Sequence, residues 1–466
     1  MGGRARRLLG ALAALALAAT MLVVGAGAAR ADDGIRARLE AIPGMRVLSE
    51  KQLSGHTFFM LAFRQPVDHG DPSRGTFEQR LNLLHRSTDR PMILHTTGYD
   101  VPDYAFTSEP TRLVDGNQVS VEERYFTPSR PDPTDWRYLN IWQAAADHHR
   151  VVQALKPIYT KPWISTGASK GGMATVYHKV LYPHDLAGAV PYVAPDNTNV
   201  RDQRPYTRFL QTVGTASCRA ALTRVQRFAL SHRKRLDAKY AAAAADNKWT
   251  FDILGSVDRA LEMAVEDTAW AFWQYHGRSE CDSVPGPDLT VDGTYAFLDK
   301  IDGMDFYADQ GAAPYIPYYY QAGTQLGWPE PDFARLGLRG LVRYPGLYTP
   351  RSNVPREIPM RFDPRVMPAI DKAVRFGGSR LLFVYGQADP WSVKRFRLGP
   401  GTRDSALYVA PGANHGADIA GLDAADRKAA TDRLLRWAGV PASSVSLKVA
   451  GTLPDDSGLR AVRRPL

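Results

Sequence analysis

The amino-acid sequence predicts an α/β fold in which a mostly parallel sheet is interrupted by a long helical insertion. The strands expected in the first 200 residues lie at 58–63, 77–84, 92–96, 119–124 and 186–193. A helix is expected at 138–155, and strands that alternate with helices imply a parallel sheet with helical crossovers. The alternation stops from about residue 200 to 360 and resumes with a helix at 364–376 and a strand at 379–385.

A serine flanked by glycines follows a further expected strand at 163–164. It stands in Gly167-Ala-Ser169-Lys-Gly171, and a helix-like segment follows at 173–181. This strand–turn–helix setting is typical of a nucleophile elbow, where the turn strains the serine backbone and the glycines avoid clashes. We therefore interpret Ser169 as a candidate nucleophile. The alternative is an ordinary glycine-rich loop.

Two later turns supply the partners that a serine nucleophile needs, a base and a group that holds the base. The strand at 379–385 leads into a turn with Asp389, and a strand at 406–410 leads into a loop with His415. His415 is the only histidine after Asp389. The order serine, acid, histidine is that of the alpha/beta-hydrolase fold. The alternatives are an Asp-Pro turn former and a loop histidine bonded to nearby backbone.

The sequence therefore predicts an alpha/beta-hydrolase fold with a mainly helical cap inserted between the nucleophile and the acid–histidine segments. The expected parts are a signal peptide (1–31), a first hydrolase part (32–200), the cap (201–360) and a second hydrolase part (361–466). The signal peptide is indicated by early arginines, an apolar run at 8–24 and the cleavage pattern Ala29-Arg-Ala31. We expect a secreted, extracellular protein cleaved near Ala31. A membrane anchor is the less favoured interpretation, because no later segment resembles a span.

Charge and cysteine content exclude several other classes. The net charge is +10, and the four arginines and no acids of residues 1–31 leave +6 for the mature chain. The basic stretch at 219–235 is interpreted as a solvated helix face, so no nucleic-acid partner is expected. Cys218 and Cys281 are the only cysteines, and export favours a single disulfide between them. No metal and no cofactor are expected.

An oxyanion hole needs two backbone N–H groups. We assign one to Lys170, which follows the candidate nucleophile, and the other to Tyr99, in the loop after the strand at 92–96. The Lys170 side chain is expected to be solvated or paired with a carboxylate. Glu122 and Glu123 end a strand at the same sheet edge and are the acids placed to bind a positive group on a substrate. Their alternative is simple solvation.

Aromatic side chains are concentrated in the expected cap. They are Tyr315, Tyr318, Tyr319, Tyr320, Trp328 and Phe333. Most are expected to pack the cap against the body, and one or two to line a pocket. An aromatic slot would suit proline, whose flat ring carries no donor.

Seven segments carry a family resemblance, in the family's order. They are Phe63-Arg-Gln-Pro-Val-Asp-His69, Thr76-Phe-Glu-Gln-Arg80, Glu122-Glu-Arg-Tyr-Phe126, Gln143-Ala-Ala-Ala-Asp147, Tyr182-Pro-His184, Tyr320-Gln-Ala-Gly-Thr-Gln-Leu-Gly327 and Gly386-Gln-Ala-Asp-Pro-Trp391. They resemble the serine exopeptidases that include lysosomal prolyl carboxypeptidase and dipeptidyl peptidase II, and look closest to the bacterial secreted tripeptidyl aminopeptidases. The resemblance implies a triad of Ser169, Asp389 and His415. It also places Tyr320, Gln321 and Trp391 at the substrate, in a cleft under the cap.

The chain departs from the classical members of that family at four positions. Glu123 replaces His, Lys170 replaces Tyr, Gly323 replaces Cys and Gln325 replaces Glu. These positions border the specificity elements, so amino- or carboxypeptidase action cannot be carried over from those members. Cleavage at the amino terminus rests on the bacterial branch and on acids suited to an α-ammonium, whose burial without a counter-charge would be costly.

The resulting hypothesis is a secreted serine exopeptidase that forms an acyl-enzyme on Ser169. It would release short peptides, expected to be tripeptides, from free amino termini, with proline favoured before the scissile bond. The alternatives are a secreted carboxylesterase or lipase with the same triad, a prolyl carboxypeptidase, and a non-enzymatic binding module. Peptide substrates are the expected partners, without stable membrane association, and the oligomeric state is not predicted.

Overall fold

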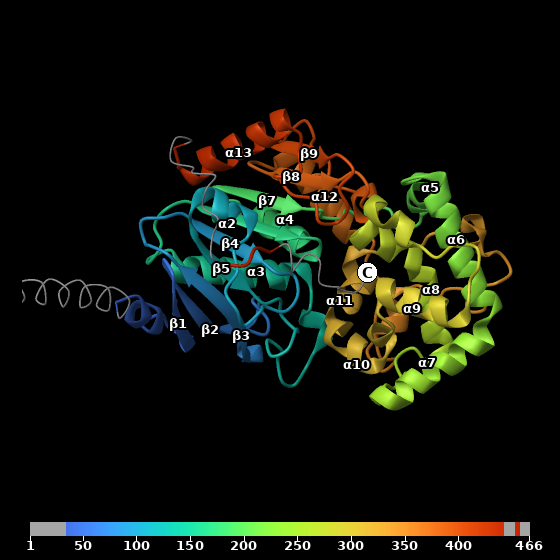
Figure 1. The fold of residues 1–466 in the computed structure, drawn as a ribbon. Coiled ribbons are helices and arrows are strands. Elements are labelled where there is room, and N and C mark those ends of the chain that lie inside the picture. The colour runs from blue at the N-terminus through green and yellow to red at the C-terminus, as the bar shows by residue number, and fades with distance from the viewer. Residues whose placement is uncertain (1–33, 442–452, 457–466) are drawn as a thin grey trace, which may run out of the picture.

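The computed structural model describes residues 34–441 and 453–456 (Figure 1). Within them nine strands form one sheet with the order β1-β2-β3-β5-β4-β6-β7-β8-β9. The strands are β1 (Met45–Leu53), β2 (His56–Pro66), β3 (Thr76–His85), β4 (Met92–Thr96), β5 (Asn117–Val121), β6 (Trp163–Ala168), β7 (Gly188–Tyr192), β8 (Leu382–Gly386) and β9 (Ala406–Ala410). The pairs β1–β2, β2–β3 and β3–β5 are antiparallel, and all later pairs are parallel. The predicted signal peptide, residues 1–31, lies outside the described residues.

The parallel strands are buried on both faces, as expected for apolar runs without polar alternation. On β8, Phe383 and Tyr385 pack into one core, and Leu382 and Val384 pack into another on the opposite face. This is the two-residue alternation of a strand. The first core is covered by α3 (Ile141–Leu155), α4 (Lys170–Leu181) and α12 (Val366–Gly377), and the second by α2 (Glu109–Val114) and α13 (Ala424–Ala438).

This topology is an alpha/beta-hydrolase fold, as the sequence predicted. One local expectation was wrong, and one strand was missed. The strand expected at 119–124 ends at Val121, because the Glu123 amide turns to donate to the Tyr99 carbonyl at 2.8 Å. The strand β1 was not expected, since all its residues after Met45 are exposed or half-buried at the edge of the sheet.

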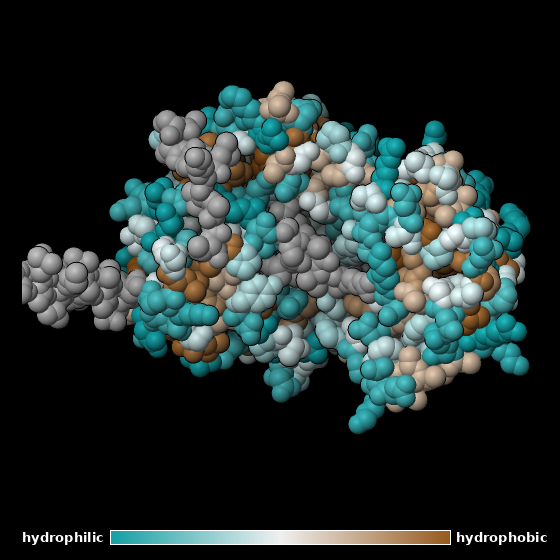
Figure 2. Space-filling view, viewed as in Figure 1, coloured by the Kyte–Doolittle hydropathy of each residue, from teal (hydrophilic) through white to brown (hydrophobic). Residues whose placement is uncertain are grey.

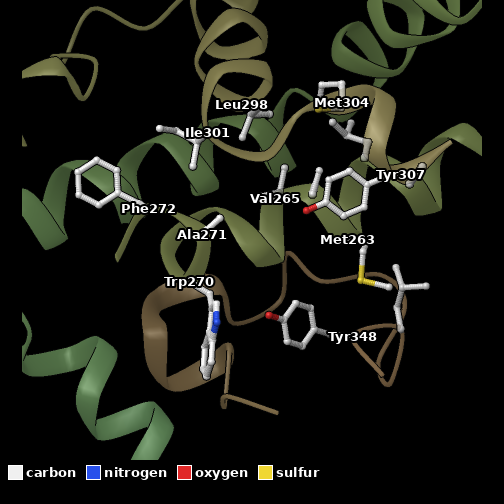
Figure 3. Close-up of a cluster of buried hydrophobic side chains, with 14 of the residues drawn as sticks. Met263, Val265, Trp270, Ala271, Phe272, Leu298, Ile301, Met304, Tyr307 and Tyr348 are labelled. Carbon is white, nitrogen blue, oxygen red and sulfur yellow. The ribbon is translucent and has the colours of Figure 1, made fainter. Parts of the chain in front are cut away.

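A helical lobe is inserted between β7 and β8 and lies beside the sheet (Figure 1). Its helices are α5 (Arg204–Thr212), α6 (Ala216–Ser231), α7 (Arg233–Asn247), α8 (Val257–Ala271), α9 (Val291–Asp302), α10 (Asp309–Ala312) and α11 (Ile316–Gln321). We call this lobe the cap. Side chains of α8 and α9 and of Tyr307 and Tyr348 form its core (Figure 3). The cap limits of 201 and 360 stay a prediction.

The cap core forms because α8 is buried along almost its whole length. Ser256 begins the helix, and its side chain accepts a hydrogen bond from the Arg259 amide at 3.2 Å. Such a cap satisfies one of the otherwise unpaired amides of the first turn. The helix ends in the segment 272–276, which continues the buried aromatic run. A buried helix must pair every polar side chain that it carries, which makes the acids of α8 informative.

The face of the molecule drawn in Figure 2 is mostly polar over the cap. Figure 2 shows hydrophilic residues over most of the cap, with apolar residues scattered among them. Among the described helices, none combines the length and the apolar character needed to cross a membrane.

The two cysteines form the disulfide that the sequence predicted. It joins Cys218 on α6 to Cys281 in the segment 278–283, with an S–S distance of 2.06 Å. Both ends lie in the cap, so the bond closes a loop within this lobe and leaves the sheet unconstrained.

Replacing both cysteines by alanine should destabilise the cap. The bond spans 63 residues of sequence, and the chain-entropy model assigns a loop of that size about 4 kcal/mol of stabilisation. Urea unfolding of the variant, compared with the oxidised wild type, measures the loss. An unchanged unfolding midpoint would show that the disulfide contributes no stability.

Candidate active site

Ser169 stands at the turn between β6 and α4 in a strained backbone conformation. Its φ and ψ are 56° and −126°, a region that residues with a side chain rarely occupy. Its amide donates to the Tyr192 carbonyl at 3.0 Å, which holds the turn against β7. A Cβ on Gly171 would lie 2.3 Å from the Thr96 carbonyl oxygen, so this position requires glycine. The predicted strand–turn–helix geometry is therefore present.

Asp389 and His415 lie together at the carboxyl ends of β8 and β9. His415 Nδ1 is 2.9 Å from Asp389 Oδ1, and both residues are buried. The carboxylate also accepts hydrogen bonds from the Ser392 hydroxyl at 2.6 Å and the Trp391 amide at 3.1 Å. These bonds fix the carboxylate, and the carboxylate fixes the imidazole.

The other ring nitrogen of His415 remains available. Nε2 is buried and makes no hydrogen bond to any described residue. The His415 amide donates to the Gln274 carbonyl of the cap at 3.1 Å, which ties this loop to the lobe above it. A histidine held at Nδ1 with its Nε2 unpartnered is prepared to accept a proton there.

A narrow pocket opens at Ser169 between the body and the cap. Its walls are Lys170, Met173, Pro195, Asn197, Tyr318, Ala322, Leu326, Gly327 and Trp391. Of the three substrate-binding residues expected from the resemblance, only Trp391 lines this pocket. Tyr320 instead packs on Trp136 with ring centroids 5.2 Å apart, and Gln321 is buried in α11. Tyr318, which the sequence analysis named only in the aromatic tract, takes the wall position.

Helix geometry explains why Tyr318 and Tyr320 differ. Residues two apart on a helix point to nearly opposite sides, so only one of the two can face the pocket. The sequence placed the aromatic tract in the cap but could not fix which side of α11 meets the body.

The two residues expected to donate to the oxyanion differ in the position and hydrogen bonding of their amides. Lys170 is the first residue of α4, where helix amides point outward along the axis. The Tyr99 amide, in contrast, donates to Thr97 Oγ1 at 3.1 Å and is therefore occupied in this structure. The loop itself is where the sequence placed it, because a Cβ on Gly98 would lie 2.4 Å from the Gly171 amide.

The Lys170 side chain is buried and paired, so the solvated alternative is wrong. Its Nζ donates to the Gly98 carbonyl at 2.7 Å and lies 3.1 Å from Glu123 Oε1. It also lies over the rings of Tyr99 and Phe126, 5.8 and 5.6 Å from their centroids. The ammonium group therefore links the elbow to the loop of Gly98 and Tyr99.

The prediction that Glu122 binds the substrate is not supported by the structure. It is fully buried, and its carboxylate accepts from Arg80 Nε at 2.9 Å, the Val101 amide at 3.0 Å and the Ser129 hydroxyl at 2.7 Å. Burial raises its pKa, and these hydrogen bonds oppose the rise. Glu123 differs, because only its Oε1 is paired; its buried Oε2 makes no hydrogen bond within the described part of the chain.

Helix α8 carries three buried acids that the sequence analysis missed. They are Glu262, Glu266 and Asp267. Asp267 accepts hydrogen bonds from the hydroxyls of Tyr307 at 2.7 Å and Tyr348 at 2.9 Å. The available signal was an apolar helical segment that carries acids at spacings of four and one.

Glu266 has an unusual environment for a carboxyl group. It is 3% exposed, and its Oε2 has no hydrogen-bond partner among the described residues. Burial raises its pKa to about 9, the neighbouring Glu262 and Asp267 add to the rise, and Arg233 opposes it. This direction of shift favours the protonated form of Glu266 at neutral pH.

The chain matches the model of the family described as PS-10 peptidase S37 over residues 28–455. It is 49% identical over 441 residues to the prolyl tri/tetrapeptidyl aminopeptidase of Streptomyces mobaraensis, covering 92% of each chain. It is 25% identical over 427 residues to the thymus-specific serine protease of Mus musculus, covering 78% of this chain and 82% of the relative.

More distant matches add little to the family assignment. The lysosomal Pro-X carboxypeptidase of Mus musculus is 28% identical over 158 residues, which is 30% of this chain and 32% of that protein. Among solved structures, the peroxisomal alpha-beta-hydrolase Lpx1 of Saccharomyces cerevisiae matches with a TM-score of 0.37 and 11% identity, covering 86% of this chain and 94% of that one. This structural likeness is too weak to support any inference about the site.

Glu122→Gln should reduce stability and leave substrate binding nearly unchanged. The substitution removes the charge of a fully buried carboxylate that pairs with the partly exposed Arg80 and accepts further hydrogen bonds from Val101 and Ser129, so a loss of about 1 to 3 kcal/mol is expected. Urea unfolding measures the stability, and steady-state kinetics on the folded variant measures KM. A large rise in KM at unchanged stability would return Glu122 to the substrate site.

Glu266→Gln should raise thermal stability above about pH 5. A folded pKa near 9 lies above the ordinary value of 4.5, so the wild type binds more protons folded than unfolded and loses stability as pH rises between these values. Glutamine cannot ionise, so the Tm of the variant should match wild type near pH 4 and exceed it increasingly towards pH 9. A difference in Tm that is constant with pH would contradict the assigned environment.

Proposed function

Because the chain belongs to the S37 family of serine peptidases, we propose that it releases tri- or tetrapeptides from free amino termini, with proline before the scissile bond. The relative from Streptomyces mobaraensis carries that activity in its name and aligns over 92% of this chain. The observation that carries the assignment within the molecule is the buried Asp389–His415 hydrogen bond at the sheet edge that also holds Ser169.

The proposed mechanism uses three residues in separate roles. His415 Nε2 takes the proton of the Ser169 hydroxyl as its oxygen attacks the scissile carbonyl carbon. Asp389 holds the imidazole through Nδ1 and stabilises its positive charge. The protonated His415 then gives this proton to the leaving amine, which departs as the remaining peptide. Water, activated by the same histidine, attacks the acyl-enzyme, and the short amino-terminal peptide leaves with Ser169 restored.

The strained elbow and the helix amide support the transition state. The turn exposes the Ser169 hydroxyl in the pocket, and the Lys170 amide at the start of α4 is directed at the oxyanion that forms. A second donor is needed. The Tyr99 amide can serve only if its bond to Thr97 Oγ1 opens when substrate binds.

Proline recognition is supported by the composition of the pocket. Met173, Ala322 and Leu326 supply apolar surface, and Tyr318 and Trp391 supply rings. A pyrrolidine ring offers no N–H and gains from apolar contact, whereas a charged side chain would lose its hydration there.

The rival functions have less support. The family match is to peptidases, which does not favour a carboxylesterase or lipase. The carboxypeptidase relatives align over only 30% of this chain, which does not favour removal of carboxyl-terminal residues. Secretion is also part of the proposal. The disulfide between Cys218 and Cys281 supports it, because such bonds persist in oxidising compartments.

Mass spectrometry of cleavage products tests the proposal. A proline-containing peptide with a free amino terminus should lose three or four residues from that end, and the acetylated peptide should remain intact. Ser169→Ala should lower kcat by several orders of magnitude, because the acyl-enzyme cannot form. Loss of carboxyl-terminal residues from both peptides would make the protein a carboxypeptidase, and near wild-type turnover by Ser169→Ala would exclude Ser169 as nucleophile.

A further inference from the structure

An enzyme that counts residues from a free amino terminus needs a fixed point that binds the α-ammonium. The structure removes Glu122 from consideration, because Arg80, Val101 and Ser129 already satisfy its carboxylate. Among the described residues, five acids have a buried carboxylate oxygen without a hydrogen-bond partner. Asp196 and Asp237 each lie against a second carboxyl group, Asp371 and Asp258, and Asp302 already accepts from the Thr268 hydroxyl at 2.9 Å. The two that are left to consider are Glu123 beside the elbow and Glu266 in the cap. The question is which of these can lie three residues away from Ser169.

Three side chains form a column along α8. Glu262, Glu266 and Trp270 are spaced by four residues, so they lie on the same side of the helix. Glu262 is satisfied: it pairs with Arg233 and accepts from the amides of Arg343 at 2.9 Å and Tyr344 at 2.6 Å. The column therefore begins at a fully bonded carboxylate.

The next two members of the column are not satisfied. Glu266 Oε2 and Trp270 Nε1 are both buried, and neither makes a hydrogen bond to a residue that the structure describes. Buried polar atoms without partners are rare in native proteins, and each one requires an explanation. Here an acceptor and a donor without partners stand one helical turn apart. A peptide terminus offers the matching pair, an ammonium group and a carbonyl oxygen.

Aromatic contacts connect this column to the pocket at Ser169. The ring of Trp391, a pocket wall, meets Trp270 edge to face at 5.3 Å and Trp328 at 6.0 Å. Trp328 in turn contacts Tyr348 at 6.1 Å, and the Tyr348 hydroxyl donates to Asp267, the neighbour of Glu266. The indole Nε1 of Trp328 is a further buried donor without a partner among the described residues.

The length of this path fits the expected product. Three extended residues span about 10 Å. The rings of Trp391, Trp328 and Tyr348 follow one another at 6.0 and 6.1 Å, so the span from Trp391 to Tyr348 is at most about 12 Å and can accommodate that length. Glu123 is less suited to the role because its charge is already used. Its Oε1 lies 3.1 Å from Lys170 Nζ, so this carboxylate has a cationic partner before any substrate binds.

Resting on the proposed function, we propose that Glu266, with Asp267 beside it, binds the α-ammonium of the substrate and so sets how many residues are released. The indole N–H groups of Trp270 and Trp328 donate to peptide carbonyls between this anchor and Ser169. Glu266 is then a specificity residue for the amino terminus.

The charge balance supports this role. A buried carboxylate without a partner is costly, and Glu266 avoids that cost by holding a proton, consistent with its pKa near 9. When the ammonium arrives, its positive charge favours the carboxylate, and the carboxyl proton leaves to solvent. An acetylated terminus carries no positive charge, so it gives the Glu266 carboxylate no counter-charge.

Kinetics of Glu266→Gln with two substrates tests the assignment. The first substrate is a proline-containing peptide with a free amino terminus, and the second is the same peptide with a hydrogen in place of the amino group. For the first, Glu266→Gln should raise KM about 10- to 100-fold with little change in kcat, the range for a lost hydrogen bond between charged groups. For the second, variant and wild type should have equal kcat/KM.

Three controls make the result specific. Asp292→Asn changes an acid of the cap whose side chain is 85% exposed, and it should leave both substrates unaffected. Labelling of Ser169 by a fluorophosphonate probe should proceed at the wild-type rate in Glu266→Gln, which shows an intact catalytic centre. Thermal unfolding confirms that the variant is folded.

The outcomes separate the two proposals. An unchanged KM in a folded, normally labelled Glu266→Gln variant would overturn the anchor and leave the exopeptidase intact. The same rise in KM from Glu123→Gln instead would place the anchor at the elbow and also overturn it. If the wild type fails to label or releases no amino-terminal fragment, the proposed function itself fails.

Discussion

The close approach of two backbone segments at Ser169 is the constraint on which the rest of the site depends. The elbow is wedged against the loop after β4, where Gly98 and Gly171 leave no room for a side chain. The Thr96 hydroxyl donates to the Gly171 carbonyl at 2.7 Å and holds the two segments together. Because these contacts fix the first turn of α4, the strained Ser169 keeps its place between the Asp389–His415 pair and the cap.

The buried charged groups of this molecule differ in how completely they are hydrogen-bonded. Next to the elbow most of them are paired: Glu122 pairs with Arg80, and Arg124 Nε donates to Asp147 at 2.6 Å. These groups hold loops, and their hydrogen bonds offset the cost of desolvation. In the cap, Glu266 is left without such compensation. A buried polar atom without a partner is rare in a folded protein, and groups with strongly perturbed pKa values are concentrated at functional sites.

The sequence predicted the sheet and the chain order of the site because both follow from local patterns. Apolar runs gave the buried strands, and the glycines around Ser169 gave the elbow. The sequence-based prediction failed at positions where tertiary contacts determine whether a side chain is buried and paired. Glu122 looked like an exposed acid at a strand end, and only the fold brings Arg80 and Ser129 to it. Glu266 could not be found, because no local pattern tells whether a helix acid points to solvent or into a core. The Tyr99 amide stays a predicted oxyanion donor, and its bond to Thr97 Oγ1 depends on a turn geometry that the sequence does not reveal.

The most direct test of the account is a crystal structure of Ser169→Ala with a proline-containing peptide bound. The account predicts the proline ring in the pocket between Tyr318 and Trp391, and the scissile carbonyl at residue 169. It also predicts the substrate ammonium within hydrogen-bond distance of Glu266. A peptide bound in the opposite direction, with its carboxylate in the cap, or an ammonium held at Glu123, would contradict it.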